Sequence, residues 1–163
     1  MADNPSLPAA ALRVEAALAA LGVSAAIRVT TASARTAREA ADALGVEVAQ
    51  IAKSLIFRAG SSGRAVLVVA AGDNRVDEQK VERLIGEKIE RADAVFVRNA
   101  TGYAIGGVPP LIDSDDALVL CDETLARFDV VWAAAGTPHA VFPIAPDELF
   151  RVTRGLVTDV RLT

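Results

Sequence analysis

The sequence predicts an α+β fold built on a mixed, largely antiparallel sheet. Apolar segments rich in β-branched residues are joined in pairs by short turn clusters, which is typical of hairpins. Segments with a helical spacing of apolar residues stand between these pairs, and this mixture is typical of α+β proteins. No repeat, low-complexity tract or long linker interrupts the 163 residues, so we expect a single domain over residues 1–163.

Two helices are indicated by their ends as well as by their spacing. Apolar residues three and four apart over residues 7–21 predict the first helix, which Ser6 would cap and Gly22 would end. Thr36 is followed three residues later by a glutamate, a capping-box spacing that predicts a helix over residues 36–44. Shorter helices are expected over residues 77–85, 93–99 and 146–152.

The strands follow from apolar runs bounded by turn residues. Residues 65–70 are apolar throughout, so their strand should be central and buried on both faces. The Gly- and Ser-rich linker 59–63 joins this strand to the preceding one as a hairpin, and the turn 136–139 joins a second hairpin. Strands are expected over residues 25–30, 50–57, 64–71, 117–121, 130–134, 140–144 and 156–160, with a short link or strand over 87–91.

The strand 50–57 carries a lysine among its largest apolar side chains. Alternation along a strand places Lys53 on one face together with Ile51, Leu55 and Phe57. Because a lysine is rarely buried without a partner, its stem could lie on the core while its ammonium reaches water. The alternative is that the rigid strand projects the cation into a pocket, where it would meet an anion.

A loop of unusual composition covers residues 101–110. It holds three glycines and two prolines, so it cannot form a regular helix or strand. Gly106 and Gly107 would let the backbone approach a ligand closely and present N–H groups to an anion or to developing negative charge. The alternative is an ordinary surface loop, since turns are where glycine and proline usually occur.

Composition argues against several classes of function. With 17 basic and 21 acidic residues the formal charge is −4, which does not suit a broad basic face for nucleic acid, and we expect no DNA partner. Neither a zinc-type Cys/His spacing nor a nucleotide-binding glycine motif occurs, so we expect no metal and no other cofactor. Residues 1–5 lack the basic opening of a signal peptide and no apolar run is long enough to span a bilayer, so we expect no membrane partner and a cytoplasmic protein.

The chain has one cysteine and one histidine. Cys121 lies in an apolar run and is expected to be a buried small hydrophobe rather than a nucleophile. His139 lies in a turn, as either a surface side chain or a base.

The lysine strand and the Gly-Gly loop together would suit the hydrolysis of an ester on a phosphate-bearing substrate.

Several motifs together resemble the YbaK family, the stand-alone relatives of the editing domain inserted in bacterial prolyl-tRNA synthetases. The matching segments follow one order between about residues 30 and 160: Thr36–Val46, Gln50–Phe57, Leu67–Val69 with Gly72 and Asp73, Thr101–Tyr103 with Gly106–Pro110, Trp132–Thr137 and Leu149.

The resemblance implies a mixed sheet curled around a pocket and flanked by helices, and hydrolysis of mischarged aminoacyl-tRNA in trans. Lys53 matches the family's essential lysine, which meets the terminal adenosine and its phosphate. Gly106 and Gly107 match the loop whose backbone amides face the scissile carbonyl. In this family a hydroxyl of the tRNA's own terminal ribose positions the attacking water, so no protein general base is implied.

The resemblance also implies the partners and the remaining site residues. The substrate would be the acceptor end of a tRNA carrying a small amino acid such as Cys, Ala, Ser or Thr, and an aminoacyl-tRNA synthetase would be a further partner. Two alternatives stay open: a module that binds an aminoacyl-adenosine or another small ligand without turnover, and an interaction subunit with a vestigial pocket. The expected substrate-binding residues are Val108, Pro109, Gly102, Gly136, Thr137 and His139.

Overall fold

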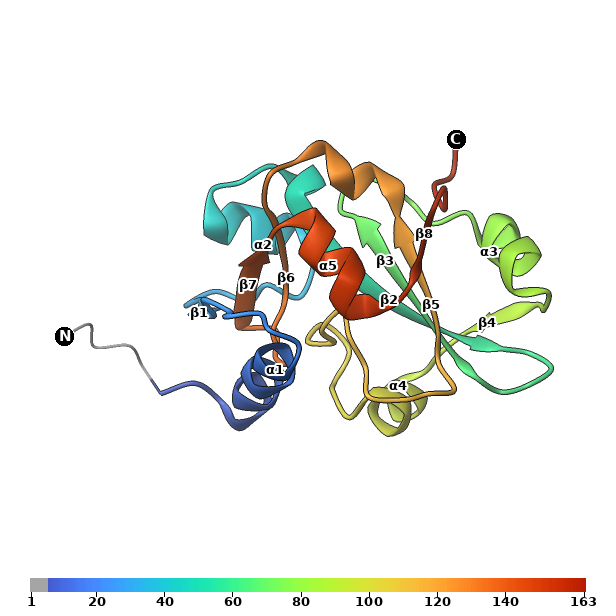
Figure 1. Cartoon of the computed structure of the whole chain (residues 1–163), viewed down its shortest axis with the longest axis horizontal. Coiled ribbons are helices and arrows are strands. Elements are labelled where there is room, and N and C mark those ends of the chain that lie inside the picture. Colours follow the sequence, from blue (N-terminus) through green and yellow to red (C-terminus); the bar gives the residue numbers. More distant parts are fainter. Residues whose placement is uncertain (1–5) are drawn as a thin grey trace.

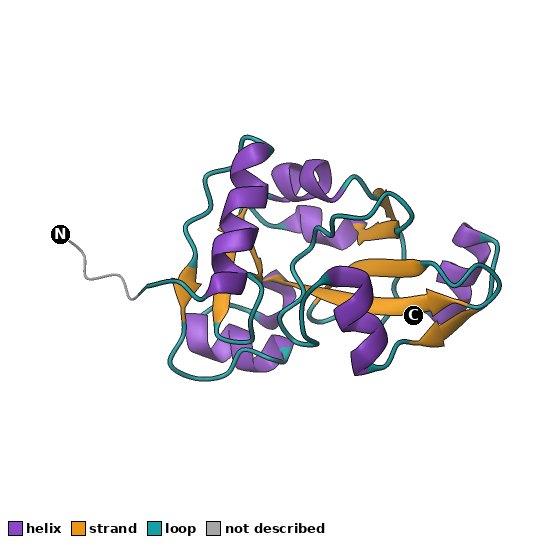
Figure 2. Ribbon diagram, turned by 90° about the horizontal axis from the view of Figure 1, so that it is seen from below, coloured by secondary structure: helices purple, strands orange, loops and turns teal. Residues whose placement is uncertain are grey.

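The computed structural model describes residues 6–163, so the segment 1–5 that bears on a signal peptide lies outside the described residues. One mixed sheet connects the strands, and helices cover both of its faces (Figures 1 and 2). The elements in chain order are α1 (Ala9–Ala20), β1 (Arg28–Val29), α2 (Ala37–Leu44), η1 (Val48–Gln50), β2 (Ile51–Ala59), β3 (Ala65–Ala71), α3 (Glu78–Ile85), β4 (Ile89–Arg91), α4 (Ala94–Thr101), β5 (Leu118–Asp122), η2 (Glu123–Arg127), β6 (Val131–Ala134), β7 (Ala140–Ile144), α5 (Pro146–Thr153) and β8 (Leu156–Thr158).

The sheet has the strand order β1-β7-β6-β2-β3-β5-β8, and β4 also pairs with β2. Within residues 6–163, the antiparallel pairs are β1–β7, β6–β7, β2–β3 and β2–β4, and the parallel pairs are β2–β6, β3–β5 and β5–β8. The predicted α+β class, the mixed sheet and both predicted hairpins are therefore confirmed. The parallel pairings join segments that are distant in sequence, so turn residues do not predict them.

Some predicted boundaries are wrong for identifiable reasons. The first helix begins at Ala9 rather than Leu7, and Pro8 occupies the N-cap position without any side-chain cap, so Ser6 does not cap it. A residue before proline is disfavoured in helical geometry, and this excludes Leu7 from the helix. The Thr36 cap is confirmed, because its hydroxyl accepts a hydrogen bond from the Glu39 N–H.

Three groups of apolar side chains pack on the sheet. The largest lies on one face under α1, α4 and α5. The opposite face carries two separate groups. The α2 cluster consists of Ala34, Ala40, Ala41, Ile51 and Val141, and the α3 cluster of Phe57, Ala59, Val66, Val68, Val81, Ile89, Leu120 and Val160.

The division of this second face determines the position of Lys53. Ile51 packs in the α2 cluster, whereas Leu55 and Phe57 pack with the α3 cluster. The predicted alternation along β2 is confirmed, since Ala52 packs with the core on the other face. Lys53 therefore stands on β2 between two apolar clusters, where the helical cover of the sheet is interrupted.

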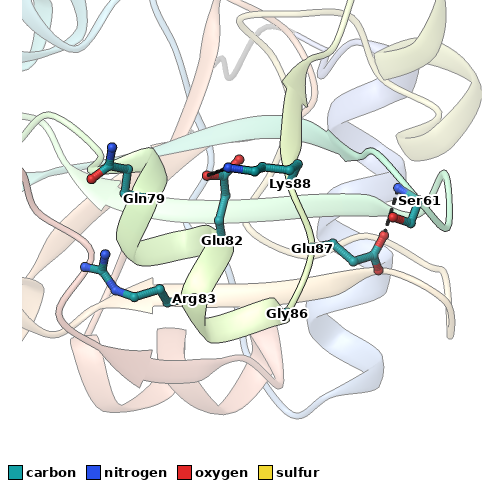
Figure 3. A pocket seen from close by; sticks show the side chains of 7 residues that line it. All are labelled: Ser61, Gln79, Glu82, Arg83, Gly86, Glu87 and Lys88. Atoms are coloured by element: carbon teal, nitrogen blue, oxygen red, sulfur yellow. Dashed lines mark hydrogen bonds and ion pairs between the residues drawn. The ribbon is translucent and has the colours of Figure 1, made fainter.

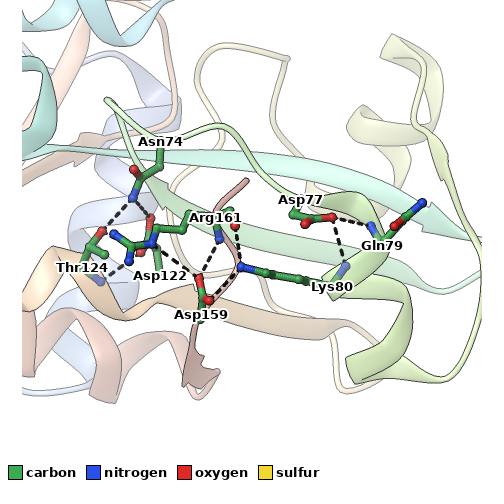
Figure 4. A network of polar contacts seen from close by, with 8 residues as sticks. All are labelled: Asn74, Asp77, Gln79, Lys80, Asp122, Thr124, Asp159 and Arg161. Carbon is green, nitrogen blue, oxygen red and sulfur yellow. Dashed lines mark hydrogen bonds and ion pairs between the residues drawn. The ribbon is translucent and has the colours of Figure 1, made fainter. Parts of the chain in front are cut away.

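A buried carboxylate joins the ends of β3 and β5 near this lysine (Figure 4). Asp122 is fully buried, and its two oxygens accept bonds from the Ala71 N–H at 3.0 Å, the Asn74 amide at 2.9 Å and both the N–H and hydroxyl of Thr124. Burial by itself would raise the pKa of Asp122, but these hydrogen bonds outweigh burial and hold it below its ordinary value.

We expect Asp122→Asn to lower the free energy of unfolding by about 1–3 kcal/mol, because the amide cannot accept from all the buried donors that the carboxylate satisfies. The native-state pKa is lowered, so this stabilisation is complete above the unfolded value of about 3.9 and is lost as pH falls through the native value. Urea unfolding between pH 2 and 7 would measure both effects. The exposed Asp129, changed to Asn, is the control, and equal stabilities of the two variants at pH 7 would contradict the assignment.

Candidate functional site

A pocket of about 350 Å³ opens beside Lys53. Its walls come from the segment before α2, the first half of β2, the loop around Gly106, and strands β6 and β7. Small apolar side chains predominate, and the charged side chains among the described lining residues are two cations, Arg35 and Lys53. The lining residues are Ala34, Arg35, Thr36, Ala37, Ala40, Ile51, Ala52, Lys53, Ser54, Leu55, Ile105, Gly106, Val108, Trp132, Ala133, Ala134 and Val141.

The pocket lies where β2 lacks a neighbour on one of its edges. β6 pairs with β2 only at Ile51 and Ala52, and β4 begins to pair with it at Phe57. Between these points, β3 is the strand that pairs with β2 in the described part of the chain. The loop carrying Gly106 lines the same pocket as this open edge, and no backbone hydrogen bond of the described residues joins the two.

Lys53 is a half-buried cation without a direct partner. None of the ion pairs or side-chain hydrogen bonds within residues 6–163 involves it. Burial lowers the pKa of Lys53, and repulsion from Arg75 acts in the same direction, while the charges of Asp73 and Asp122 oppose the shift. Asp73 itself pairs with Arg127 at 3.2 Å. Two acidic side chains at longer range therefore favour the charged form of Lys53, and its ammonium remains free to bind an anion.

The glycine loop differs from the expected pair of amide donors. The Gly107 N–H already donates to the Ala104 carbonyl at 3.0 Å, and the Gly107 carbonyl accepts from Gly136 at 2.9 Å. Gly107 does not line the pocket, whereas Gly106 and Val108 do, and neither of their N–H groups has a partner among the described residues. Because the Gly107 N–H is used within the turn, the available backbone donors are the N–H groups of Gly106 and Val108.

Both glycines are needed for close approach. A Cβ at Gly107 would lie 2.7 Å from the Gly136 carbonyl oxygen, and one at Gly106, whose φ is +89°, would lie 2.8 Å from Cγ of Arg35. The stem of Arg35 therefore lies across the glycine loop. Arg35 therefore lines the pocket beside Gly106, a position that sequence reasoning missed because it depends on two segments about 70 positions apart.

The remaining predicted site residues do not line the pocket. Gly136 and Thr137 pack against Gly107. His139 is exposed, and its carbonyl accepts from the Thr30 N–H at 2.7 Å, which fixes the segment leading to Arg35. Pro109 and Gly102 lie near α1 instead. Pro109 lines a separate hollow there, and the Gly102 carbonyl accepts a hydrogen bond from the Arg13 guanidinium.

Other lining residues were seen in the sequence only as structural elements. Thr36, the predicted helix cap, and Trp132, in the middle of the predicted strand 130–134, both line the pocket. The Arg28 guanidinium covers the ring of Trp132 at 5.0 Å. Ser54 also lines the pocket, and apart from its position after Lys53 no sequence pattern indicates this. The prediction for Cys121 is confirmed, because it is fully buried and burial raises its pKa.

Two larger hollows have different chemistry. One of about 550 Å³ beside α3 is shallow, and three of its charged side chains have partners: Glu87 accepts from the N–H groups of Ser61 and Ser62, and Glu82 pairs with Lys88 (Figure 3). The other, of about 520 Å³, lies between α1 and the loop around Asp113 and mixes basic with acidic side chains. Neither hollow is lined by a residue of the open edge of β2.

Two kinds of feature are absent from residues 6–163. No group of three or more histidine, cysteine or acidic side chains is arranged to hold a metal ion. None of the helices there has the length and apolar character needed to cross a membrane.

The fold and the pocket define a small α+β protein with one cationic, apolar-walled site, and similar proteins are known. The aminoacyl-tRNA editing domain matches residues 31–152. A solved structure described as a candidate trans-editing enzyme for prolyl tRNA synthetase is 42% identical, with a TM-score of 0.90 over 97% of this chain and 100% of that one. The uncharacterised protein YwhH of Bacillus subtilis (strain 168) is 38% identical over 117 residues, which are 72% of this chain and 74% of that protein.

A third relative carries a more specific name. A protein of Enterococcus faecalis, provisionally named Cys-tRNA(Pro)/Cys-tRNA(Cys) deacylase EbsC, is 24% identical over 126 residues, 77% of this chain and 76% of that protein. The chain therefore belongs to the aminoacyl-tRNA editing domain family, of the YbaK type.

The burial of Lys53 predicts an unusual effect on stability. Because its native-state pKa is lowered, the unfolded chain binds this proton more readily than the native protein, and the charge destabilises the fold at neutral pH. We expect Lys53→Met to raise the Tm at pH 7, by about 2–4 °C for each kcal/mol gained. The gain should shrink as pH rises through the lowered native value towards about 10.4, where both states lose the charge.

Thermal unfolding of wild type and variant between pH 7 and 10.5 would measure this effect. Lys88→Met is the matched control, because the Lys88 side chain is 89% exposed. A lower Tm for Lys53→Met at pH 7 would show instead that the ammonium has a stabilising partner.

Proposed function

We propose that the protein is a deacylase that hydrolyses the ester of a mischarged aminoacyl-tRNA in trans. The observation that carries this proposal is the unpaired, half-buried Lys53 in one pocket with the free N–H groups of Gly106 and Val108. A cation and two backbone donors suit a substrate that has both a phosphate and an ester carbonyl. Membership in the editing-domain family supports the same reaction.

Each group has a distinct role in the proposed reaction. Lys53 binds the phosphate of the terminal nucleotide and so fixes the ester in the pocket. The oxygen of a water molecule attacks the ester carbonyl, and the N–H groups of Gly106 and Val108 stabilise the oxyanion that forms. The ester C–O bond then breaks, the ribose oxygen takes a proton, and the free amino acid and the tRNA leave. Among the described residues, those that line the pocket include no histidine or carboxylate, which agrees with a substrate hydroxyl that positions the water.

The walls of the pocket favour a small amino acid. Six alanines at positions 34, 37, 40, 52, 133 and 134 line it together with Ile51 and Val141. Such a surface offers an apolar contact and excludes long side chains by size. Discrimination among Ala, Cys, Ser and Thr by fit alone is weak, about 1–3 kcal/mol per methylene. We therefore expect the protein to accept more than one of these amino acids.

A second candidate function is a module that binds aminoacyl-adenosine without turning it over. The lack of a general base in the described lining favours this reading as much as it favours assistance by the substrate. The two functions differ in whether the bound ester is consumed.

Deacylation of tRNAs charged with Cys, Ala, Ser, Thr and Pro would separate these functions. We expect rapid release of one or two of the amino acids, and we expect Lys53→Ala to lower kcat/KM by about 100-fold or more, because a buried anion would lose its partner. Lys88→Ala, which alters an exposed lysine, serves as the control and should keep the wild-type rate. Background rates for every tRNA, identical in wild type and Lys53→Ala, would contradict the deacylase function and leave the two non-catalytic alternatives, of which the binding module alone predicts stabilisation by aminoacyl-adenosine.

The net charge of −4 predicts a small footprint on the tRNA. We expect contact with the acceptor end alone, with help from an aminoacyl-tRNA synthetase as a partner. The logarithm of kcat/KM plotted against the logarithm of salt concentration should then have a slope of about −2 or shallower, since few counter-ions are released. A slope of about −5 would indicate many phosphate contacts and would contradict the small footprint.

A further inference from the structure

Ser54 combines several polar groups that have no partner in the protein. Its hydroxyl oxygen is buried and makes no hydrogen bond within the described residues. Leaving a buried hydroxyl unpaired costs about 1–3 kcal/mol, so a native orphan of this kind needs an explanation. Alternation along β2 directs the Ser54 side chain to the face opposite Lys53, and the pocket reaches this face as well, because Ala52, Ala133 and Val108 of the core on that face also line it. A ligand that enters the pocket through the open edge of β2 would supply the missing partner.

The backbone of Ser54 is also open. Gly72 donates to the Ile51 carbonyl and Ala59 donates to the Arg64 carbonyl, so the odd-numbered residues of β2 direct their N–H and C=O groups to β3. The even-numbered residues therefore direct theirs to the opposite edge. Pairing with β6 ends at Ala52 and pairing with β4 begins at Phe57, and the N–H and C=O of Ser54 fall in this gap.

Three unpaired groups thus belong to one residue: an N–H donor, a carbonyl acceptor and a hydroxyl. An open strand edge binds extended, peptide-like groups through its backbone. An aminoacyl ester resembles one residue of such a strand, because an amino group and a carbonyl flank its α-carbon. The pocket lining within residues 6–163 has no carboxylate, so the amino group must find its acceptors among carbonyl and hydroxyl oxygens.

We infer that the open edge of β2 at Ser54 is the subsite for the aminoacyl group, with the substrate's α-amino group donating to the Ser54 carbonyl and hydroxyl. This inference rests on the proposed action on aminoacyl-tRNA. It assigns a role to a residue that carries neither the cation nor the oxyanion donors. It also predicts that the protein recognises the amino group directly and not only the size of the side chain.

Binding of stable analogues tests the subsite without relying on turnover. The probes are alanyl-adenosine with an amide in place of the ester, and the propionyl analogue, which lacks only the amino group. We expect wild-type protein to bind the alanyl probe about 10-fold more tightly by calorimetry, and Ser54→Ala to reduce that preference to a few-fold, because the backbone carbonyl remains. Equal affinity of wild-type protein for the two probes, or binding of neither, would overturn the inference.

Two further measurements separate this role from a structural one. Ser54→Ala removes an unsatisfied hydroxyl, so its Tm should equal or exceed that of wild type while its preference for the amino group falls. Ser114→Ala changes an exposed serine away from the pocket and should alter neither quantity. A reduced preference that appears only with a lower Tm would attribute the effect to folding and would also overturn the assignment.

Hydrolysis distinguishes failure of the subsite from failure of the proposed function. If wild-type protein releases the amino acid equally fast from alanyl-tRNA and from tRNA charged with lactic acid, which has a hydroxyl in place of the amine, the deacylase function stands and the subsite falls. If it releases neither but prefers the alanyl probe in calorimetry, the subsite stands and the deacylase function falls.

Discussion

The central constraint in this structure is a half-buried ammonium group that has no direct counter-ion among the described residues. Lys53 stands on β2 between the α2 and α3 clusters, and burial there disfavours its charge. The fully buried carboxylate of Asp122 and the charge of Asp73 oppose that effect from a distance. Asp122 is kept ionised by hydrogen bonds from the ends of β3 and η2, so the cation and its electrostatic support share one rigid framework.

The same region contains several groups that would be more stable if paired. They are the Lys53 ammonium, the hydroxyl and the backbone N–H and C=O of Ser54, and the N–H groups of Gly106 and Val108. Each one lowers stability, and the extensive apolar packing on the opposite face under α1, α4 and α5 offsets this cost. Unsatisfied groups that converge on one pocket, in a protein whose core is otherwise well packed, are typical of a preorganised binding site.

The glycine loop shows why a motif in a sequence does not specify which atoms act. Two adjacent glycines suggested two adjacent amide donors. In the structure, the turn from Ala104 to Gly107 uses the second amide internally, and the contact with Gly136 fixes the loop against β6 and β7. The free donors are consequently those of Gly106 and Val108. Only the path of the backbone determines this, because an N–H group carries no signature in the side-chain sequence.

The sequence by itself determined the fold class, most of the elements and the strand that carries the lysine. These features depend on local signals: the alternation on β2, the run in β3, the Thr36 cap and the turn residues of both hairpins. Only the tertiary structure decided which edge of β2 stays open, which amides are free, and that Arg35, Trp132 and Ser54 share the pocket with Lys53. Those outcomes arise from parallel pairings and loop contacts between residues far apart in the chain, and spacing along a sequence does not encode them.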